Sequence, residues 1–243
     1  MRVAILSDIH GNLEALEAVV ADIPSRAVDR IVCLGDMIGY GPDPDAVVSL
    51  VRAIGCSAIL GNHEAALISE SARRWMNFQA QENSIRTEQL LSEESREYCR
   101  NLPRSLVLAG ALFVHGFPPD SVFIYLNRQS DRRIAELFAS SPISLFVLGH
   151  THELQLVRME AGEVVRLPLG KGVVRISPQV KTIVNAGSVG QPRDRDKSAK
   201  YLIWDQATQE LEVRYISYDC EATVKKIRLL GFPEAYAERL CGP

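Results

Sequence analysis

Five short apolar runs in this 243-residue chain each lead to an aspartate, an asparagine or a histidine. Runs of this kind, bounded by turn residues, are typical of buried strands. In open α/β sheets, ligand-binding groups gather just beyond the carboxyl ends of the strands. All five histidines stand at these ends, whereas histidines used only for packing would be scattered. The runs are 3–6, leading to Asp8 and His10; 31–34, to Asp36; 58–60, to Asn62 and His63; 112–114, to His115; and 145–148, to His150 and His152.

The first half of the chain alternates these runs with helical patterns. Asn12 is placed to cap a helix whose apolar residues over 13–20 recur at helical spacing. Asp43 followed by Pro44 marks the start of a second helix. Strand–helix alternation of this kind predicts a parallel or mixed sheet covered by helices.

The second half has the pattern of hairpins. Residues 154–159 and 164–167 flank one polar turn, and residues 201–204 and 211–215 flank another. These pairs predict an antiparallel sheet, and a short C-terminal helix is expected to end at 231–233. Two sheets packed face to face, with helices outside, account for both halves as an α/β (α+β) fold. With no internal repeat or Pro/Gly-rich linker, residues 1–243 are predicted to form a single domain.

Residues 65–102 are polar and helical in character. We expect two or three helices beside the sheet, which either simply cover it or overhang the site as a partial lid. Trp75, Met76 and Phe78 are expected in the core rather than on a base-stacking platform.

Composition excludes several classes of protein. The net charge is −3, and no clustered basic face is visible, which argues against binding of long nucleic acid. No signal peptide or membrane-length apolar run occurs. The five cysteines form an odd set without a C-x-x-C pair, which favours a reducing cytoplasm over a disulfide framework. The sequence does not indicate the oligomeric state.

The residue types at the five strand ends suit a pair of divalent cations. Carboxylate and neutral imidazole ligate manganese, iron or zinc, and an aspartate can bridge two ions. Asp8/His10 and His150/His152 have the i, i+2 spacing that places both side chains on one face of an extended segment. Two-metal sites are a recurring device for hydrolysing phosphate esters. We therefore predict two divalent metal ions, with manganese ahead of iron and zinc.

At these positions the chain resembles the calcineurin-like metallophosphoesterases. The resemblance covers five blocks in the family's order, spanning residues 8–152, and a weaker sixth block at 185–188. The runs 39–42 and 187–194 resemble bacterial and archaeal phosphodiesterase-like members. The five blocks are Asp8-Ile9-His10-Gly11-Asn12, Gly35-Asp36, Gly61-Asn62-His63-Glu64, His115-Gly116 and Gly149-His150-Thr151-His152.

The resemblance implies a four-layer α-β-β-α sandwich and a role for each matched residue. One metal would be held by Asp8, His10, Asp36 and His152, and the other by Asp36, Asn62, His115 and His150, with Asp36 bridging. A hydroxide held by the metals would attack phosphorus in line, and His63 would protonate the leaving oxygen. Asn62 and the metals would stabilise charge on the phosphoryl group.

Two positions depart from the family pattern. Relatives often carry an acidic or amide residue three positions after the bridging aspartate, where this chain has Gly39, so the group that orients His63 is open. After His115-Gly116 the run is Phe117-Pro118-Pro119-Asp120 in place of a small and a basic residue, which predicts different substrate contacts on that loop.

Several alternatives stay open at this stage. Tyr40 either contacts substrate or packs, and Arg193 either holds a phosphate oxygen or belongs to a solvated charge run. Phosphodiesters and nucleotide polyphosphates fit the resemblance as substrates, with a phosphomonoesterase as the second possibility. A non-catalytic scaffold on the same fold and a structural zinc protein are the competing classes. The phosphate-loop, nucleophile-elbow and dinucleotide motifs are missing.

Overall fold

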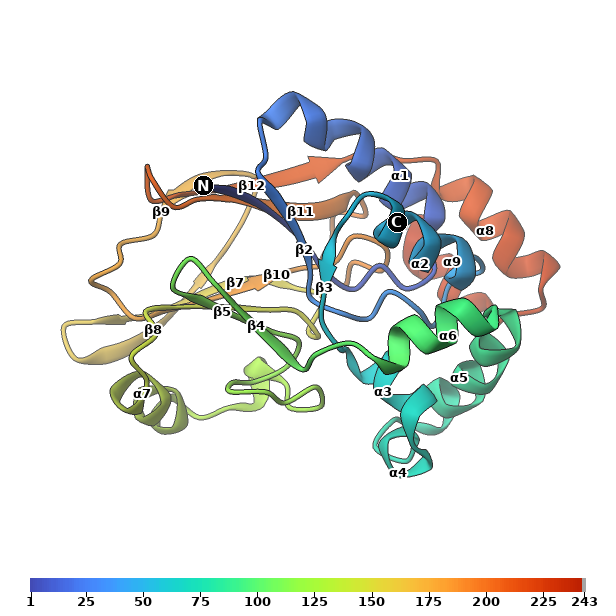
Figure 1. Cartoon of the computed structure of the whole chain (residues 1–243), viewed down its shortest axis with the longest axis horizontal. Helices are drawn as coiled ribbons and strands as arrows, with labels where there is room; N and C mark the ends of the chain where they lie inside the picture. Colours follow the sequence, from blue (N-terminus) through green and yellow to red (C-terminus); the bar gives the residue numbers. More distant parts are fainter. Residues whose placement is uncertain (242–243) are drawn as a thin grey trace.

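The computed structural model describes residues 1–241 and contains two six-stranded mixed sheets (Figure 1). Sheet A has the order β3 (Ser57–Ala58), β2 (Arg30–Cys33), β1 (Arg2–Leu6), β11 (Ala199–Asp205), β12 (Glu210–Ile216) and β9 (Gly172–Arg175). Sheet B has the order β4 (Ser105–Leu108), β5 (Ala111–Val114), β6 (Leu145–Leu148), β10 (Thr182–Ala186), β7 (Leu154–Glu160) and β8 (Glu163–Pro168).

The alternation of side chains along β1 shows how the layers are built. Val3 and Ile5 join the apolar cluster between the two sheets, whereas Ala4 and Leu6 join the cluster under the helices α1 (Leu13–Asp22) and α2 (Pro44–Ala53). Successive strand residues face opposite sides, so a strand buried on both faces is apolar throughout. On the outer face of sheet B, α7 (Asp131–Ser140) packs Phe138 against Phe146. The predicted four-layer sandwich is confirmed.

Parallel pairing places the informative strand ends together. β1, β2 and β3 run parallel in sheet A, and β5, β6 and β10 run parallel in sheet B. The two expected hairpins exist, but they lie in different sheets. β11 pairs with β1 in sheet A, and β7 pairs with β10 in sheet B. The prediction that both belong to one antiparallel sheet was wrong, because each hairpin extends a parallel group in its own sheet.

Residues 62–100 form a group of helices at one side of the sandwich, at the lower right of Figure 1. Trp75 and Phe78 are 75% and 74% exposed, so their predicted core positions were wrong, whereas Met76 is buried. The ring of Trp75 lies at the surface and stacks on Phe123 with the centroids 5.7 Å apart. The helices are α3 (Asn62–Ile68), α4 (Glu70–Arg73), α5 (Phe78–Leu90) and α6 (Glu93–Arg100); the 3₁₀ turns η1 (Ile23–Arg26) and η2 (Leu126–Arg128) lie elsewhere.

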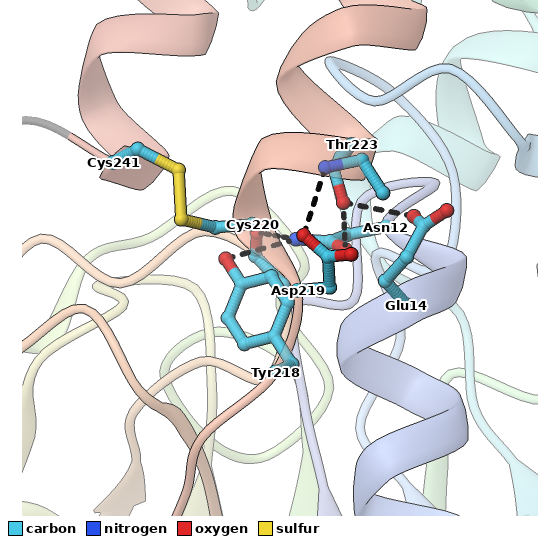
Figure 2. Close-up of a disulfide and its surroundings, with 9 residues drawn as sticks. Asn12, Glu14, Tyr218, Asp219, Cys220, Thr223 and Cys241 are labelled. Carbon is cyan, nitrogen blue, oxygen red and sulfur yellow. Dashed lines mark hydrogen bonds between the residues drawn. A yellow bond between two sulfur atoms is a disulfide. The ribbon is translucent and has the colours of Figure 1, made fainter.

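The C-terminal region forms a helical hairpin where only one helix was expected. α8 (Cys220–Leu229) is followed by α9 (Glu234–Cys241), and the two share an apolar cluster that packs against Tyr40. Figure 2 shows a disulfide between Cys220 and Cys241, contrary to the expectation that the odd cysteine set forms none. It also shows the Thr223 hydroxyl donating to Asn12 and Glu14, which ties α8 to the start of α1.

No helix among residues 1–241 has the length and apolar character needed to span a bilayer.

Asp22, at the end of α1, accepts hydrogen bonds from Tyr201, Arg214 and Arg26. Burial alone would raise its pKa, but these hydrogen bonds lower the pKa to about 2, below its ordinary value of 3.8. The stabilisation by the Asp22 carboxylate is therefore complete above the ordinary pKa and is lost as the pH falls towards about 2.

Asp22→Asn should lower the unfolding free energy at pH 7 by about 1–2 kcal/mol and flatten its acid dependence. Urea unfolding between pH 7 and the acid limit measures both.

Asp120→Asn is the matched control, since Asp120 is exposed and has no hydrogen bond among the described residues. A loss in this variant equal to that of Asp22→Asn would contradict the assignment to the Asp22 contacts.

Candidate metal centre

The predicted ligands lie in the loops that follow β1, β2, β5 and β6, at the edge where the two sheets meet. Asn62 and His63 begin α3, directly after β3. Asp8, His10, Asp36, His150 and His152 all have φ between 51° and 69°, in the left-handed region. Non-glycine residues rarely occupy that region, and each costs on the order of 1 kcal/mol. Such outliers cluster at functional sites, where the surrounding structure holds them in place.

The side chains of these loops form two groups that share Asp36. In the first, Asp8, His10, Asp36 and His152 each offer a ligand atom, and these atoms all lie within 4.8 Å of one another. In the second, Asp36, His115 and His150 do the same. The Asn62 Oδ1 lies 3.1 Å from the His115 Nε2, so the amide belongs with the second group. The structure therefore brings all seven predicted ligand positions together.

Four of the histidines are oriented by backbone carbonyl groups. The Nδ1 atoms of His10, His115 and His152 lie 2.9, 2.8 and 2.7 Å from the carbonyl oxygens of residues 38, 34 and 191. The His150 Nε2 lies 3.2 Å from the carbonyl oxygen of residue 123. If each of these nitrogens carries the proton, the other ring nitrogen presents a lone pair to the centre. This is the usual arrangement around a metal-binding histidine.

The inward-facing nitrogens make contacts that suit a cation. The His10 Nε2 lies 3.1 Å from the His152 Nε2, and the His115 Nε2 lies 3.2 Å from the His150 Nδ1. Two lone pairs at this distance repel unless a proton or a metal ion lies beside them. The Asp8 Oδ1 is buried and accepts no hydrogen bond from the described residues. The donor set therefore fits a pair of divalent metal ions.

The pKa values of the cluster reflect competition between burial and charge. Burial and the charge of Asp36 raise the pKa of Asp8 to about 6, against a lowering by His115. Burial alone would lower the pKa of His115, but the Asp36 carboxylate raises it to about 9. Burial and the charge of His115 lower the pKa of His150 to about 3. The protein thus holds a proton near Asp36, where a cation would replace it.

His63 differs from the other four histidines. Its backbone N–H donates to the Asp36 Oδ1 at 2.9 Å, but its Nδ1 is buried without a hydrogen-bond partner among residues 1–241. The ring packs edge-on against His10 and Tyr40, with centroid distances of 4.8 and 4.7 Å. The structure places His63 beside the ligand groups and outside both of them.

Glu64 is a site residue to which the sequence interpretation gave no role. Its buried carboxylate accepts hydrogen bonds from the backbone N–H groups of Gly61, Asp36, Met37 and Ile38. It stands three positions after Gly61, the spacing at which an acidic side chain reaches back to the start of a helix. This spacing in the sequence could have indicated a structural role for Glu64.

The sixth block supports the site through the backbone. The Ser188 hydroxyl donates to the carbonyl oxygen of Asp8 at 2.7 Å, and the Asn185 amide donates to that of Gly149 at 2.6 Å. Both side chains are fully buried. They hold the loops after β1 and β6 without belonging to either ligand group.

A cavity of about 470 Å³ opens beside the ligand groups. Both predicted substrate contacts, Tyr40 and Arg193, line it. Tyr40 lies edge-on to His10, with a centroid distance of 4.7 Å. The Arg193 Nε is buried without a hydrogen-bond partner among the described residues, and its charge contributes to lowering the pKa of His10 and His152.

Known proteins match the chain over its whole length. The family model described as the calcineurin-like phosphoesterase superfamily domain matches residues 1–209. An uncharacterized protein of Methanocaldococcus jannaschii is 31% identical, over 98% of this chain and 96% of its own. The crystal structure of a metallophosphoesterase from Sphaerobacter thermophilus superposes with a TM-score of 0.85 at 35% identity, covering 100% of this chain and 99% of its own.

A third similarity is local. The symmetrical bis(5'-nucleosyl)-tetraphosphatase of Pectobacterium atrosepticum is 33% identical over 72 residues, which is 28% of this chain and 26% of that protein. The full-length matches and the family model establish the relationship. The chain belongs to the calcineurin-like phosphoesterase superfamily and is a hydrolase acting on phosphate esters.

Proposed function

We propose that the chain hydrolyses phosphodiesters or nucleotide polyphosphates at a dinuclear centre, with manganese as the preferred metal. The observation that carries the proposal is the pair of ligand groups joined by Asp36. A carboxylate shared between two sets of neutral imidazoles suits two transition-metal ions better than magnesium, which prefers oxygen ligands and water. The short match to a bis(5'-nucleosyl)-tetraphosphatase supports polyphosphate substrates.

The residues of the centre have different proposed roles in catalysis. When bound, the two cations would lower the pKa of a water molecule and offset charge on the phosphoryl group. Asn62 directs its amide oxygen at the second ligand group, which leaves its N–H₂ group to donate to a phosphoryl oxygen. Arg193 supplies a further cationic donor beside the ligand groups.

His63 is the proposed general acid. Burial lowers its pKa, the charge of Asp36 raises it, and the charges of His115 and Arg193 lower it further. The negative charge of a bound phosphate would favour the imidazolium form, which can protonate the leaving oxygen. Gly39 and Tyr40 replace a carboxylate as its orienting groups. A Cβ atom at position 39 would lie 2.1 Å from the His63 Nδ1, so only glycine lets the backbone approach the ring this closely.

The remaining features of the proposal concern the whole chain. We propose one domain over 1–243, with α5 and the residue before it forming a wall of the cavity through Asn77, Gln79 and Ala80. We keep the cytoplasm as the proposed location because three of the five cysteines, Cys33, Cys56 and Cys99, are free buried thiols; the Cys220–Cys241 disulfide is the feature that favours an oxidising compartment instead. Small phosphorylated molecules are the proposed substrates, and neither long nucleic acid nor a membrane is a proposed partner.

A phosphomonoesterase is the second candidate, since the same two-metal chemistry serves both ester classes. A non-catalytic scaffold is disfavoured, because all seven ligand positions and His63 are present around one point.

Protein purified without chelator should contain close to two equivalents of transition metal, because two ligand groups are present. Activity on bis(4-nitrophenyl) phosphate should disappear in EDTA and return best with manganese. Asp36→Ala removes the shared carboxylate, so it should bind at least one equivalent fewer. Metal analysis and metal-reconstituted turnover provide the measurements. Full activity in excess chelator would end the proposal.

His63→Gln should retain both metals and slow turnover by ~10²–10⁴-fold on an ester with a poor leaving group. The loss should be smaller for a nitrophenyl ester, because nitrophenolate departs without protonation. Steady-state rates on the two esters, with metal content measured in parallel, test the role. Equal losses on both esters would mean that His63 does not act as the acid.

Gly39→Ala should displace the His63 ring and lower turnover by about 10–100-fold with both metals retained, because the new methyl group collides with Nδ1. Gly110→Ala is the matched control. Gly110 has φ +81°, close to the +89° of Gly39, but a Cβ there meets no atom within 4 Å. This control carries the same backbone strain and should keep wild-type turnover. Similar losses in both variants would assign the effect to strain alone.

A further inference from the structure

Three arginines from separate parts of the chain line the cavity beside the metal centre. Arg128 comes from η2, Arg193 from the loop after β10, and Arg239 from α9. We call this cavity the arginine pocket. Glu153 is the single carboxylate that lines it. None of the three guanidinium groups has a carboxylate within 4 Å among residues 1–241, so the pocket carries an excess of positive charge.

The arginine pocket borders the ligand groups, because Tyr40 and Tyr125 in its wall pack against their histidines. The Tyr125 ring stacks on His150 with the centroids 3.8 Å apart, and Tyr40 touches both His10 and His63. The backbone N–H of Arg193 donates to the carbonyl oxygen of His152 at 3.3 Å, whereas neither Arg128 nor Arg239 has a hydrogen bond to a ligand residue within the described part of the chain. We therefore place Arg193 against the centre, and Arg128 and Arg239 farther along the pocket.

The aromatic rings that line the pocket already pack against other side chains. Tyr125 is covered by His150 on one side and by the Arg128 guanidinium, 5.1 Å from the ring centroid. Tyr236 is buried and meets Tyr40 edge-on, with the centroids 5.1 Å apart. Asn77, Gln79, Asn127 and Thr151 also line the pocket, but its three guanidinium groups offer the strongest contacts to an anion, which favours recognition by charge.

The side of the pocket formed by α9 belongs to the C-terminal helical hairpin and lies outside the family match. Arg239 is two positions before Cys241, whose disulfide joins α9 to α8 (Figure 2). Tyr236 and Leu240, on either side of Arg239, are buried in the cluster of the same hairpin. The family model ends at residue 209, so Arg239 comes from a segment that the shared phosphoesterase pattern does not describe.

We propose that the arginine pocket is a second anion subsite, which binds the phosphoryl group adjacent to the scissile one. This inference rests on the proposed function and narrows the substrate class to phosphoanhydride chains, such as those of nucleoside polyphosphates. One water is consumed: its oxygen forms the new P–O bond, and the bridging oxygen leaves with the neighbouring phosphoryl group. One proton of the water replaces the proton that His63 gives to the bridging oxygen, and the other stays on the new phosphate or is released to solvent. The pocket does not discriminate between nucleobases, because its contacts recognise the negative charge of the phosphate chain.

Inorganic tripolyphosphate is the probe for direct binding, since it carries the phosphate chain without a base. Calorimetry on the full chain freed of metal should show tripolyphosphate binding that Arg239→Gln and Arg128→Gln each weaken by about tenfold, because each removes a charge-assisted contact. Both side chains are exposed, so folding should be retained. Arg132→Gln is the control, since Arg132 lies on α7, pairs with Glu136 and is absent from the pocket. Its binding should match the wild type.

Hydrolysis by the manganese-loaded enzyme gives the second readout. In Arg239→Gln, the kcat/KM for a nucleoside triphosphate relative to that for bis(4-nitrophenyl) phosphate should fall about tenfold, because only the triphosphate has a second phosphoryl group. Adenosine, guanosine and uridine triphosphates should be hydrolysed with similar kcat/KM.

The outcomes separate this inference from the proposed function. Unchanged tripolyphosphate binding in Arg239→Gln, or equal losses on both substrates, would overturn the second subsite while leaving the phosphoesterase proposal intact. Arginine-dependent binding without turnover of any substrate would support the subsite and overturn the proposed function. A strong preference for one base would contradict recognition by charge.

Discussion

The buried carboxylate of Glu64 is the contact on which the metal centre depends. Its two oxygens accept four backbone hydrogen bonds, three from the loop that carries Asp36 and one from Gly61. This single side chain therefore sets the distance between the end of β2 and the start of α3. Burial and the charge of Asp36 raise the pKa of Glu64 to about 7, against the lowering by the hydrogen bond from the Asp36 N–H and by the charge of His115. Cations held by Asp36 would offset the repulsion, so metal binding and the geometry of this loop support each other.

The strained backbone of the ligand loops is held by the same kind of contact. The N–H of Asp8 donates to Gly35 and that of His10 donates to Asp36, so the loops after β1 and β2 remain paired beyond the ends of their strands. In sheet B, the N–H of Gly149 donates to His115. These bonds satisfy backbone groups that would otherwise be buried unpaired, at a cost of about 1–3 kcal/mol each. The left-handed φ values are maintained because leaving them would break the pairing.

The sequence predicted the layers and the ligand groups because both follow from local patterns. An apolar run ending on Asp8 or His150 specifies a strand and its functional end together, and parallel pairing then brings those ends to one edge. It did not predict which sheet each hairpin joins, because strand partners such as β10 and β7 are chosen by packing over long distances. The surface positions of Trp75 and Phe78 were missed for a related reason. Trp75 lies in a turn and Phe78 begins a helix, and hydrophobicity alone does not show whether a side chain at such a position is covered. α9 was missed because it is short and follows Pro233 closely.

The proposed metal binding and the proposed substrate selection therefore depend on different parts of the structure: the loops at the strand ends and the helices beside them. The ligand loops continue strands, so their positions are fixed by sheet geometry within the part of the chain that the family model covers. The outer wall of the arginine pocket is built by helices, and Arg239 reaches it only because α9 packs on α8 and Tyr40. Tyr40 contacts both parts of the site, since its ring centroid lies 4.7 Å from those of His10 and His63 and 5.1 Å from that of Tyr236. If the proposed subsite exists, a change in the C-terminal hairpin would alter phosphate-chain binding without moving a metal ligand. In the proposed assignment, the strand ends supply the chemistry and the helices packed beside them contribute to substrate binding.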